Sequence, residues 1–131
     1  MKALRTVALF ALAAVAGLSC GDNNRPQPGT LNVRLTSPNS GADSAIVLTI
    51  NGPAPLTSAS AGPGLRLFQQ PLGGTATRFA LVGQLNNAAV ILTIGVADVG
   101  TVSQYSGVIQ GVALPNYQLR TLTGYGLAVT R

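Results

Sequence analysis

The sequence predicts an all-β fold, a single antiparallel β-sandwich that covers residues 30–131. Apolar and polar residues alternate in short segments, which is the period of a strand with one buried face. Turn-forming glycine, proline and asparagine residues separate these segments. Beyond the N-terminal region, no apolar pattern keeps a helical period for longer than one turn. Several short strands divided by such turns are typical of two packed sheets.

The expected strands follow one another without a helical segment between them. Leu31, Val33 and Leu35 alternate with polar residues, and the strongest segment covers 90–96. The expected strands are 31–36, 45–50, 56–60, 65–69, 77–82, 90–96, 104–112 and 125–130. The expected core consists of Leu31, Val33, Leu35, Ile46, Leu48, Ile50, Phe79, Leu81, Val90, Leu92, Ile94 and Val129.

Two segments, 45–50 and 89–94, have nearly the same sequence, AIVLTI and AVILTI. An internal duplication is one explanation, and two central strands under the same packing demand are the other. The flanking residues do not match, which favours the second. In strict alternation Val47 and Ile91 face outward, and Thr49 and Thr93 lie beside them. Because apolar groups on a wet face indicate a contact surface, these four residues are the predicted contact face.

Residues 1–19 predict a signal peptide. Lys2 and Arg5 precede a short apolar run that ends in small residues, a pattern too short for a spanning helix. The only cysteine, Cys20, follows at once. The stretch Gly17-Leu18-Ser19-Cys20 resembles the lipobox of bacterial lipoprotein precursors, although leucine stands one position later than is usual there. An ordinary secretory signal that happens to end near a cysteine is the alternative.

The lipobox resemblance implies a location. It implies that the Cys20 thiol carries a diacylglycerol and becomes the new N-terminus, so the partner would be a membrane, held through the lipid. Residues 20–29 contain two prolines and no large apolar residue, and they read as a tether. Gly21 follows the cysteine, and aspartate does not. In two-membrane bacteria this favours the outer membrane, and otherwise the outer face of the cell membrane.

The charge pattern excludes a nucleic-acid partner. The whole chain has a formal charge of +5 from eight basic and three acidic residues, and charged residues make up only 8% of it. A typical soluble domain has about 25%. Beyond residue 19 six arginines are scattered singly, with no lysine among them. Since nucleic-acid binding requires a dense basic patch, this dispersion speaks against it.

The residues beyond position 20 offer little catalytic chemistry. They contain no His, Glu, Lys or Cys, whereas acid–base catalysis depends on such groups and on Asp. Asp22 lies in the tether, so only Asp43 and Asp98 remain. We expect no enzyme, no cofactor and no transition-metal site. A weak calcium site that uses Asn39, Ser40 and Asp43 or Asp98 stays open, because these are oxygen ligands.

Tyrosines are the remaining candidates for ligand contact. Tyr105, Tyr117 and Tyr125 are possible sugar contacts, since aromatic rings stack on sugars, although half-buried packing is the other explanation. Three segments, Gly29–Thr36, Asp43–Gly52 and Phe79–Gly83, are similar to the strand order of cohesin-like sandwich modules of exported bacterial proteins. This resemblance implies a cohesin-like or immunoglobulin-like sandwich, whose function is a separate question. We therefore expect a non-catalytic, protein-contacting or structural module of the cell envelope, with carbohydrate binding as the alternative.

Overall fold

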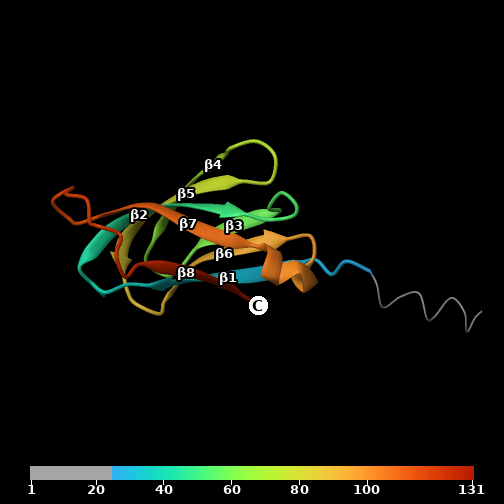
Figure 1. The fold of residues 1–131 in the computed structure, drawn as a ribbon, viewed down its shortest axis with the longest axis horizontal. Helices are drawn as coiled ribbons and strands as arrows, with labels where there is room; N and C mark the ends of the chain where they lie inside the picture. Colours follow the sequence, from blue (N-terminus) through green and yellow to red (C-terminus); the bar gives the residue numbers. More distant parts are fainter. Residues whose placement is uncertain (1–24) are drawn as a thin grey trace, which may run out of the picture.

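Two four-stranded antiparallel sheets pack face to face in the computed structural model, which describes residues 25–131 (Figure 1). One sheet has the order β3-β6-β1-β8, and the other has the order β4-β5-β2-β7. The strands are β1 (Gly29–Thr36), β2 (Asp43–Asn51), β3 (Ser58–Ala61), β4 (Arg66–Pro71), β5 (Thr77–Leu85), β6 (Val90–Val96), β7 (Ser106–Ala113) and β8 (Gly126–Thr130). The all-β sandwich predicted from the sequence is confirmed.

Residues 1–24 lie outside the described part of the chain. The predicted signal peptide, the lipid site at Cys20 and the first half of the tether therefore remain predictions. The described chain begins at one end of the long axis, and the segment between β7 and β8 lies at the other end (Figure 1).

Nearly every connection crosses from one sheet to the other. Only β4 and β5 are consecutive strands of the same sheet. Their turn contains Gly73 and Gly74, both at positive φ, where side chains with a Cβ are strained. The strands β2 and β6, which carry the two similar segments, each have neighbours on both sides. The explanation as two central strands is thus the one that the fold supports.

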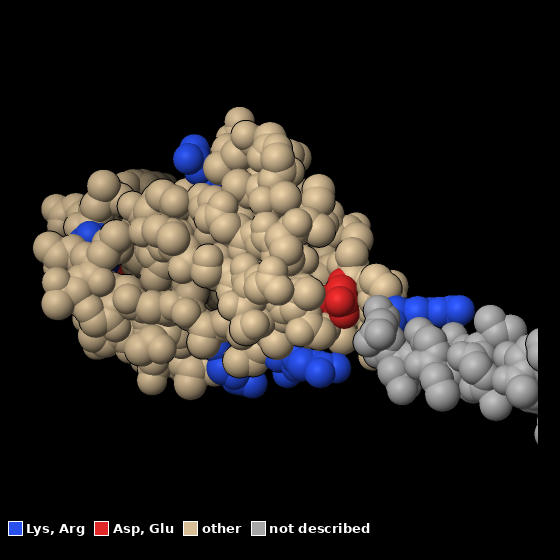
Figure 2. Space-filling view, turned by 45° about the vertical axis from the view of Figure 1, so that its right-hand side comes forward, with Lys and Arg blue, Asp and Glu red and all other residues tan. Residues whose placement is uncertain are grey.

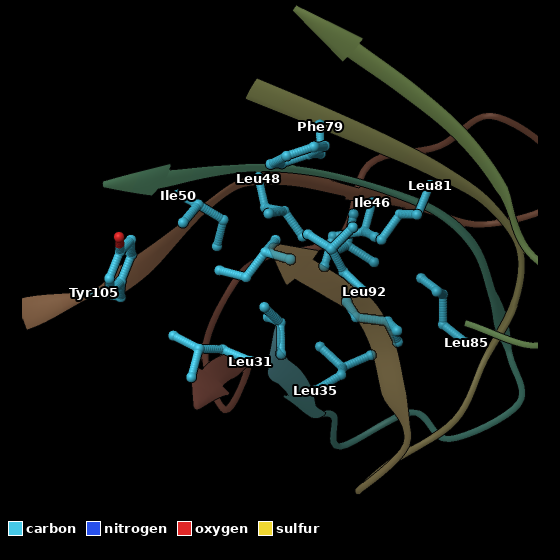
Figure 3. Close-up of a cluster of buried hydrophobic side chains, with 14 of the residues drawn as sticks. Leu31, Leu35, Ile46, Leu48, Ile50, Phe79, Leu81, Leu85, Leu92 and Tyr105 are labelled. Atoms are coloured by element: carbon cyan, nitrogen blue, oxygen red, sulfur yellow. The ribbon is translucent and has the colours of Figure 1, made fainter. Parts of the chain in front are cut away.

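The core lies between the sheets and contains ten of the twelve predicted residues (Figure 3). Val129 packs against this core while half-buried. The buried residues not predicted are Leu85, Ile91, Val96, Tyr105 and Val112. Each fully buried aliphatic or aromatic side chain of this kind contributes about 1.5–3 kcal/mol through removal from water.

A β-bulge in β6 reverses the expected orientation of two neighbours. Val33 pairs with Leu92 and Arg34 pairs with Val90, so Ile91 has no partner on β1. The extra residue turns Ile91 into the core, where it is 1% exposed. Val90 is half-buried and lies beside Arg34. The predictions of Val90 in the core and Ile91 on the surface were therefore wrong, because alternation assumes an uninterrupted ladder.

A six-residue 3₁₀ helix, η2 (Val99–Gln104), holds the start of the described chain. The Asp98 side chain caps it by accepting from the Gly100 backbone N–H at 2.9 Å. The same carboxylate oxygen accepts from the Gln27 N–H at 3.2 Å, and the Gln27 carbonyl accepts from Val99 N–H at 2.8 Å. The last residues of the predicted tether are thus fastened to the sandwich before β1 begins.

Candidate functional site

The outer surface of the β4-β5-β2-β7 sheet is apolar at its centre. Directly paired residues project to the same side of a sheet, and one outward row runs Phe68, Ala80, Val47 and Gly111 across the four strands. The adjacent outward rows contain Arg66, Val82, Ala45 and Ala113, and Gln70, Arg78, Thr49 and Val108. We call these three rows the apolar face.

Three large apolar side chains of the apolar face are exposed to solvent. Phe68 is 53% exposed, Val82 43% and Val108 54%. An antiparallel sheet with one wet side normally carries polar residues there, so this exposure is unusual. Exposed apolar groups gathered on one surface indicate a site of contact with another molecule.

A shallow depression of about 260 Å³ lies in the apolar face. Val47 and Ala80 line its centre, and Phe68, Gln69, Gln70 and Arg78 complete the lining. The small side chain of Ala80 leaves room between the larger ones on β4 and β2. The depression thus has an apolar floor and a polar or cationic side.

Charge on the apolar face is entirely positive within the described part of the chain. The Arg66 guanidinium lies 5.7 Å from the centre of the Phe68 ring, within range of a cation–π contact. Arg78 projects from the neighbouring strand. The two described acids are elsewhere, since Asp43 is buried and Asp98 caps η2. Figure 2 shows how sparse charged side chains are on one side of the molecule.

Thr49 is the unusual polar residue of this face. It is only 6% exposed, and it pairs with Arg78 on one side and Val108 on the other. Its hydroxyl is buried and has no hydrogen-bond partner. Because nearly all buried polar groups in proteins are paired, such a group calls for a physical explanation.

The other outer surface, on the β3-β6-β1-β8 sheet, is polar. Its central row runs Ser60, Thr93, Asn32 and Thr130. The Thr93 hydroxyl approaches the Asn32 side-chain oxygen at 3.5 Å. The predicted contact face of Val47, Thr49, Ile91 and Thr93 is therefore divided. The first two residues lie on the apolar face, Thr93 lies on the opposite side of the sandwich, and Ile91 is in the core.

The three tyrosines do not form one surface. Tyr105 is in the core, and its ring lies so close to Gly52 that a Cβ there would approach it to 2.2 Å. Burial raises the pKa of the Tyr105 hydroxyl, and a hydrogen bond with Thr101 partly opposes this. Its placement in the core contradicts the prediction of Tyr105 as a sugar contact.

Tyr125 is hydrogen-bonded to a partly buried ion pair between Arg120 and Asp43. The Arg120 Nε lies 2.7 Å from Asp43 Oδ1, and the Tyr125 hydroxyl donates to Asp43 Oδ2 in a short hydrogen bond. The Asn39 amide donates to the Tyr125 oxygen at 2.8 Å. The hydrogen bond to Asp43 raises the pKa of the Arg120 guanidinium. This network fastens the long β7–β8 connection to the start of β2.

The same network bears on the calcium hypothesis. Both carboxylate oxygens of Asp43 accept from protein donors, and the Ser40 hydroxyl accepts from the Asn87 N–H at 2.9 Å. Asp98, beside η2, lies at the opposite end of the sandwich from Asp43, at the start of β2 (Figure 1). Asp98 therefore does not lie with Asn39, Ser40 and Asp43, and residues 25–131 contain no group of three His, Cys, Asp or Glu side chains placed to hold a metal.

Tyr117 stands alone at a turn between β7 and β8. It is 91% exposed, its φ is +68°, and nearby Leu119 is 78% exposed. A bulky side chain in this left-handed region is uncommon. The Leu114 N–H donates to the Gln118 carbonyl at 2.9 Å, which closes the turn. Of the predicted sugar contacts, this is the residue that solvent reaches freely.

The comparisons with known proteins give no relatives. No family model, no curated protein and no solved structure matches the chain. Within residues 25–131, no helix has the length and apolarity needed to cross a membrane.

Sequence reasoning missed most of the apolar face. Val47 and Thr49 were found by strand alternation, but Phe68, Val82 and Val108 belong to strands with weaker patterns. In 77–82 the alternation that places Phe79 and Leu81 inside also places Val82 outside. The outward position of Val82 in this strand could therefore have indicated the apolar face from the sequence.

Proposed function

We propose that this chain is a lipid-anchored bacterial envelope protein whose non-catalytic β-sandwich binds another protein through the apolar face. The observation that carries the proposal is the difference between the two outer surfaces. One is lined by hydroxyl and amide side chains, whereas the other exposes Phe68, Val82 and Val108. An apolar centre with a polar or charged surround is the layout of protein–protein interfaces.

The anchoring part of the proposal rests on the sequence of residues 1–20. Mass spectrometry of the natural N-terminus is expected to find an acylated Cys20. Cys20→Ala is expected to move the protein from the membrane fraction to the soluble fraction. An N-terminus at another residue would refute the anchor and leave the apolar face unaffected.

The absence of catalysis is supported by how the described acids are used. Asp43 is held by Arg120 and Tyr125, and Asp98 caps η2. The two lie at opposite ends of the sandwich, so they do not form a carboxylate pair of the kind that glycosidases need.

Site-directed photo-crosslinking in the native host tests the contact. A photoreactive amino acid replaces Phe68 or Val108 on the apolar face, and Ser60 or Thr130 on the polar face serves as control. We expect discrete crosslinked products from the first pair of positions and none from the second. Equal crosslinking from both surfaces would refute the proposed contact.

Carbohydrate binding is the second candidate, and Tyr117 is the observation that favours it. Its ring is almost fully exposed, and Asn116 and Gln118 beside it are exposed polar groups. Retention on insoluble envelope polysaccharide that is lost in Tyr117→Ala would support this function. Retention unchanged in that variant would exclude the tyrosine as the sugar contact.

A further inference from the structure

The depression in the apolar face is shallow and is lined mainly by apolar groups. It measures about 260 Å³ and has a floor of Val47 and Ala80 with Phe68 at its side. Sites that enclose a whole small-molecule ligand are typically larger and deeper, at about 300–1,000 Å³. A side chain that belongs to a larger partner suits this shape, because the partner's own surface covers what the depression leaves open.

The positive charge around the depression indicates which groups of the partner flank the side chain that enters it. Arg78 lines the depression, and Arg66 lies over the adjacent Phe68. Arginine binds carboxylates with two parallel hydrogen bonds, which makes it suited to reading an acid at an interface. A second copy of this chain is a poor occupant, because a face-to-face pair would bring arginines against arginines without a described acid between them.

Thr49 lies in the same row as Arg78, but it is not among the residues that line the depression. Its buried hydroxyl lacks a partner and belongs to the residue paired directly with Arg78. The Arg78 guanidinium, which lines the depression, is therefore the group on this face that favours a carboxylate.

Resting on the proposed function, we propose that the occupant of the apolar face is a segment of another protein in which an apolar side chain is flanked by carboxylates. The apolar side chain enters the depression over Val47 and Ala80, and a carboxylate binds Arg78. Arg78 is then the residue that selects the partner, and Phe68 supplies the apolar wall.

The photo-crosslinking experiment at position 108, carried out in the full chain in its native membrane, also tests this proposal. Arg78→Gln is expected to lower the yield of crosslinked partner about tenfold, the effect of losing roughly 1.4 kcal/mol. Arg78→Lys should restore part of the crosslinking yield, because lysine returns the positive charge without the bidentate hydrogen bonds of arginine. Arg131→Gln, which removes an exposed arginine outside the apolar face, is expected to leave the yield unchanged.

Labelled peptides test the chemistry with the detergent-solubilised full chain. The probe is Ser-Glu-Phe-Glu-Ser, and the controls are Ser-Lys-Phe-Lys-Ser and Ser-Glu-Ser-Glu-Ser. We expect fluorescence anisotropy to show binding of the probe alone, weaker at high salt and about tenfold weaker in Arg78→Gln. Equal binding of the lysine peptide, or no binding of the probe at 1 mM, would overturn the proposed occupant.

The outcomes separate this inference from the function on which it rests. Crosslinking from the apolar face that persists in Arg78→Gln would refute the acidic occupant and leave the protein contact intact. A crosslinked product of twice the chain mass would show a second copy as the occupant and also refute it. No selective crosslinking from the apolar face would refute both.

Discussion

The bulge in β6 makes a sharp prediction about two adjacent residues. Strict alternation places Val90 in the core and Ile91 outside, and the fold places them the other way round. Truncating each to alanine in separate variants therefore compares the two arrangements directly. Ile91→Ala is expected to be strongly destabilising, and Val90→Ala is expected to be nearly neutral.

The magnitude follows from burial. Ile91 is 1% exposed, and its truncation removes three carbons, at about 0.8 kcal/mol each from the loss of apolar burial. The cavity left behind adds to this, so the total falls within about 2–5 kcal/mol. A domain of this size has a free energy of unfolding of about 5–15 kcal/mol. Val90 is half-buried and lies beside Arg34, so its truncation should cost less than about 1 kcal/mol.

Urea unfolding followed by circular dichroism measures both variants. The chain from residue 21 onward is suitable, because it retains every described strand. We expect a large drop in the midpoint for Ile91→Ala with an unchanged slope, and a midpoint near wild type for Val90→Ala. A larger loss for Val90→Ala than for Ile91→Ala would refute the bulge and restore the uninterrupted ladder.

Three further predictions address the remaining structural features. Tyr125→Phe should cost about 1–3 kcal/mol in thermal unfolding, because it leaves an oxygen of the buried Asp43 carboxylate without its donor. Gly62→Ala should destabilise the fold, since its Cβ would lie 2.2 Å from the Val90 carbonyl oxygen, whereas Gly111→Ala, with no atom within 4 Å, should be tolerated. Burial raises the pKa of Tyr105 above the usual value near 10, so its contribution to stability is present below pH 10 and falls as the pH rises beyond it. Tyr105→Phe should show a flatter stability profile above pH 10, and an identical slope would contradict that assignment.

Strand positions could be predicted from the sequence because each depends on local alternation. The segments around Leu48 and Leu92 show the strand period clearly, and both lie in central strands. The pairing of strands could not be predicted in the same way. Nearly every connection crosses between the sheets, so neighbours in space are seldom neighbours in sequence.

The errors at the candidate site have the same physical origin. Val47 and Ile91 occupy matching positions in two similar segments, but those segments lie in different sheets. In β6 a bulge turns Ile91 into the core, whereas Val47 stays on the outer surface. The role of Tyr125 depends on Asp43, which is 82 residues away in the sequence. No local sequence pattern indicates so distant a hydrogen-bond partner. The structure was therefore needed to show that Tyr125 is hydrogen-bonded to Asp43, whereas Tyr117 is exposed.

The fastening of Gln27 beside η2 determines how the domain would respond to a pulling force. A pull on the residues before β1 first strains the two hydrogen bonds that join Gln27 to Asp98 and Val99. The load then passes along β1, which has an antiparallel neighbour on each side. Because hydrogen bonds between strands run perpendicular to the strand direction, such a pull shears both ladders at once. A pull applied to the residues before β1 is therefore transmitted into a strand that is paired along both edges, where many hydrogen bonds share the load.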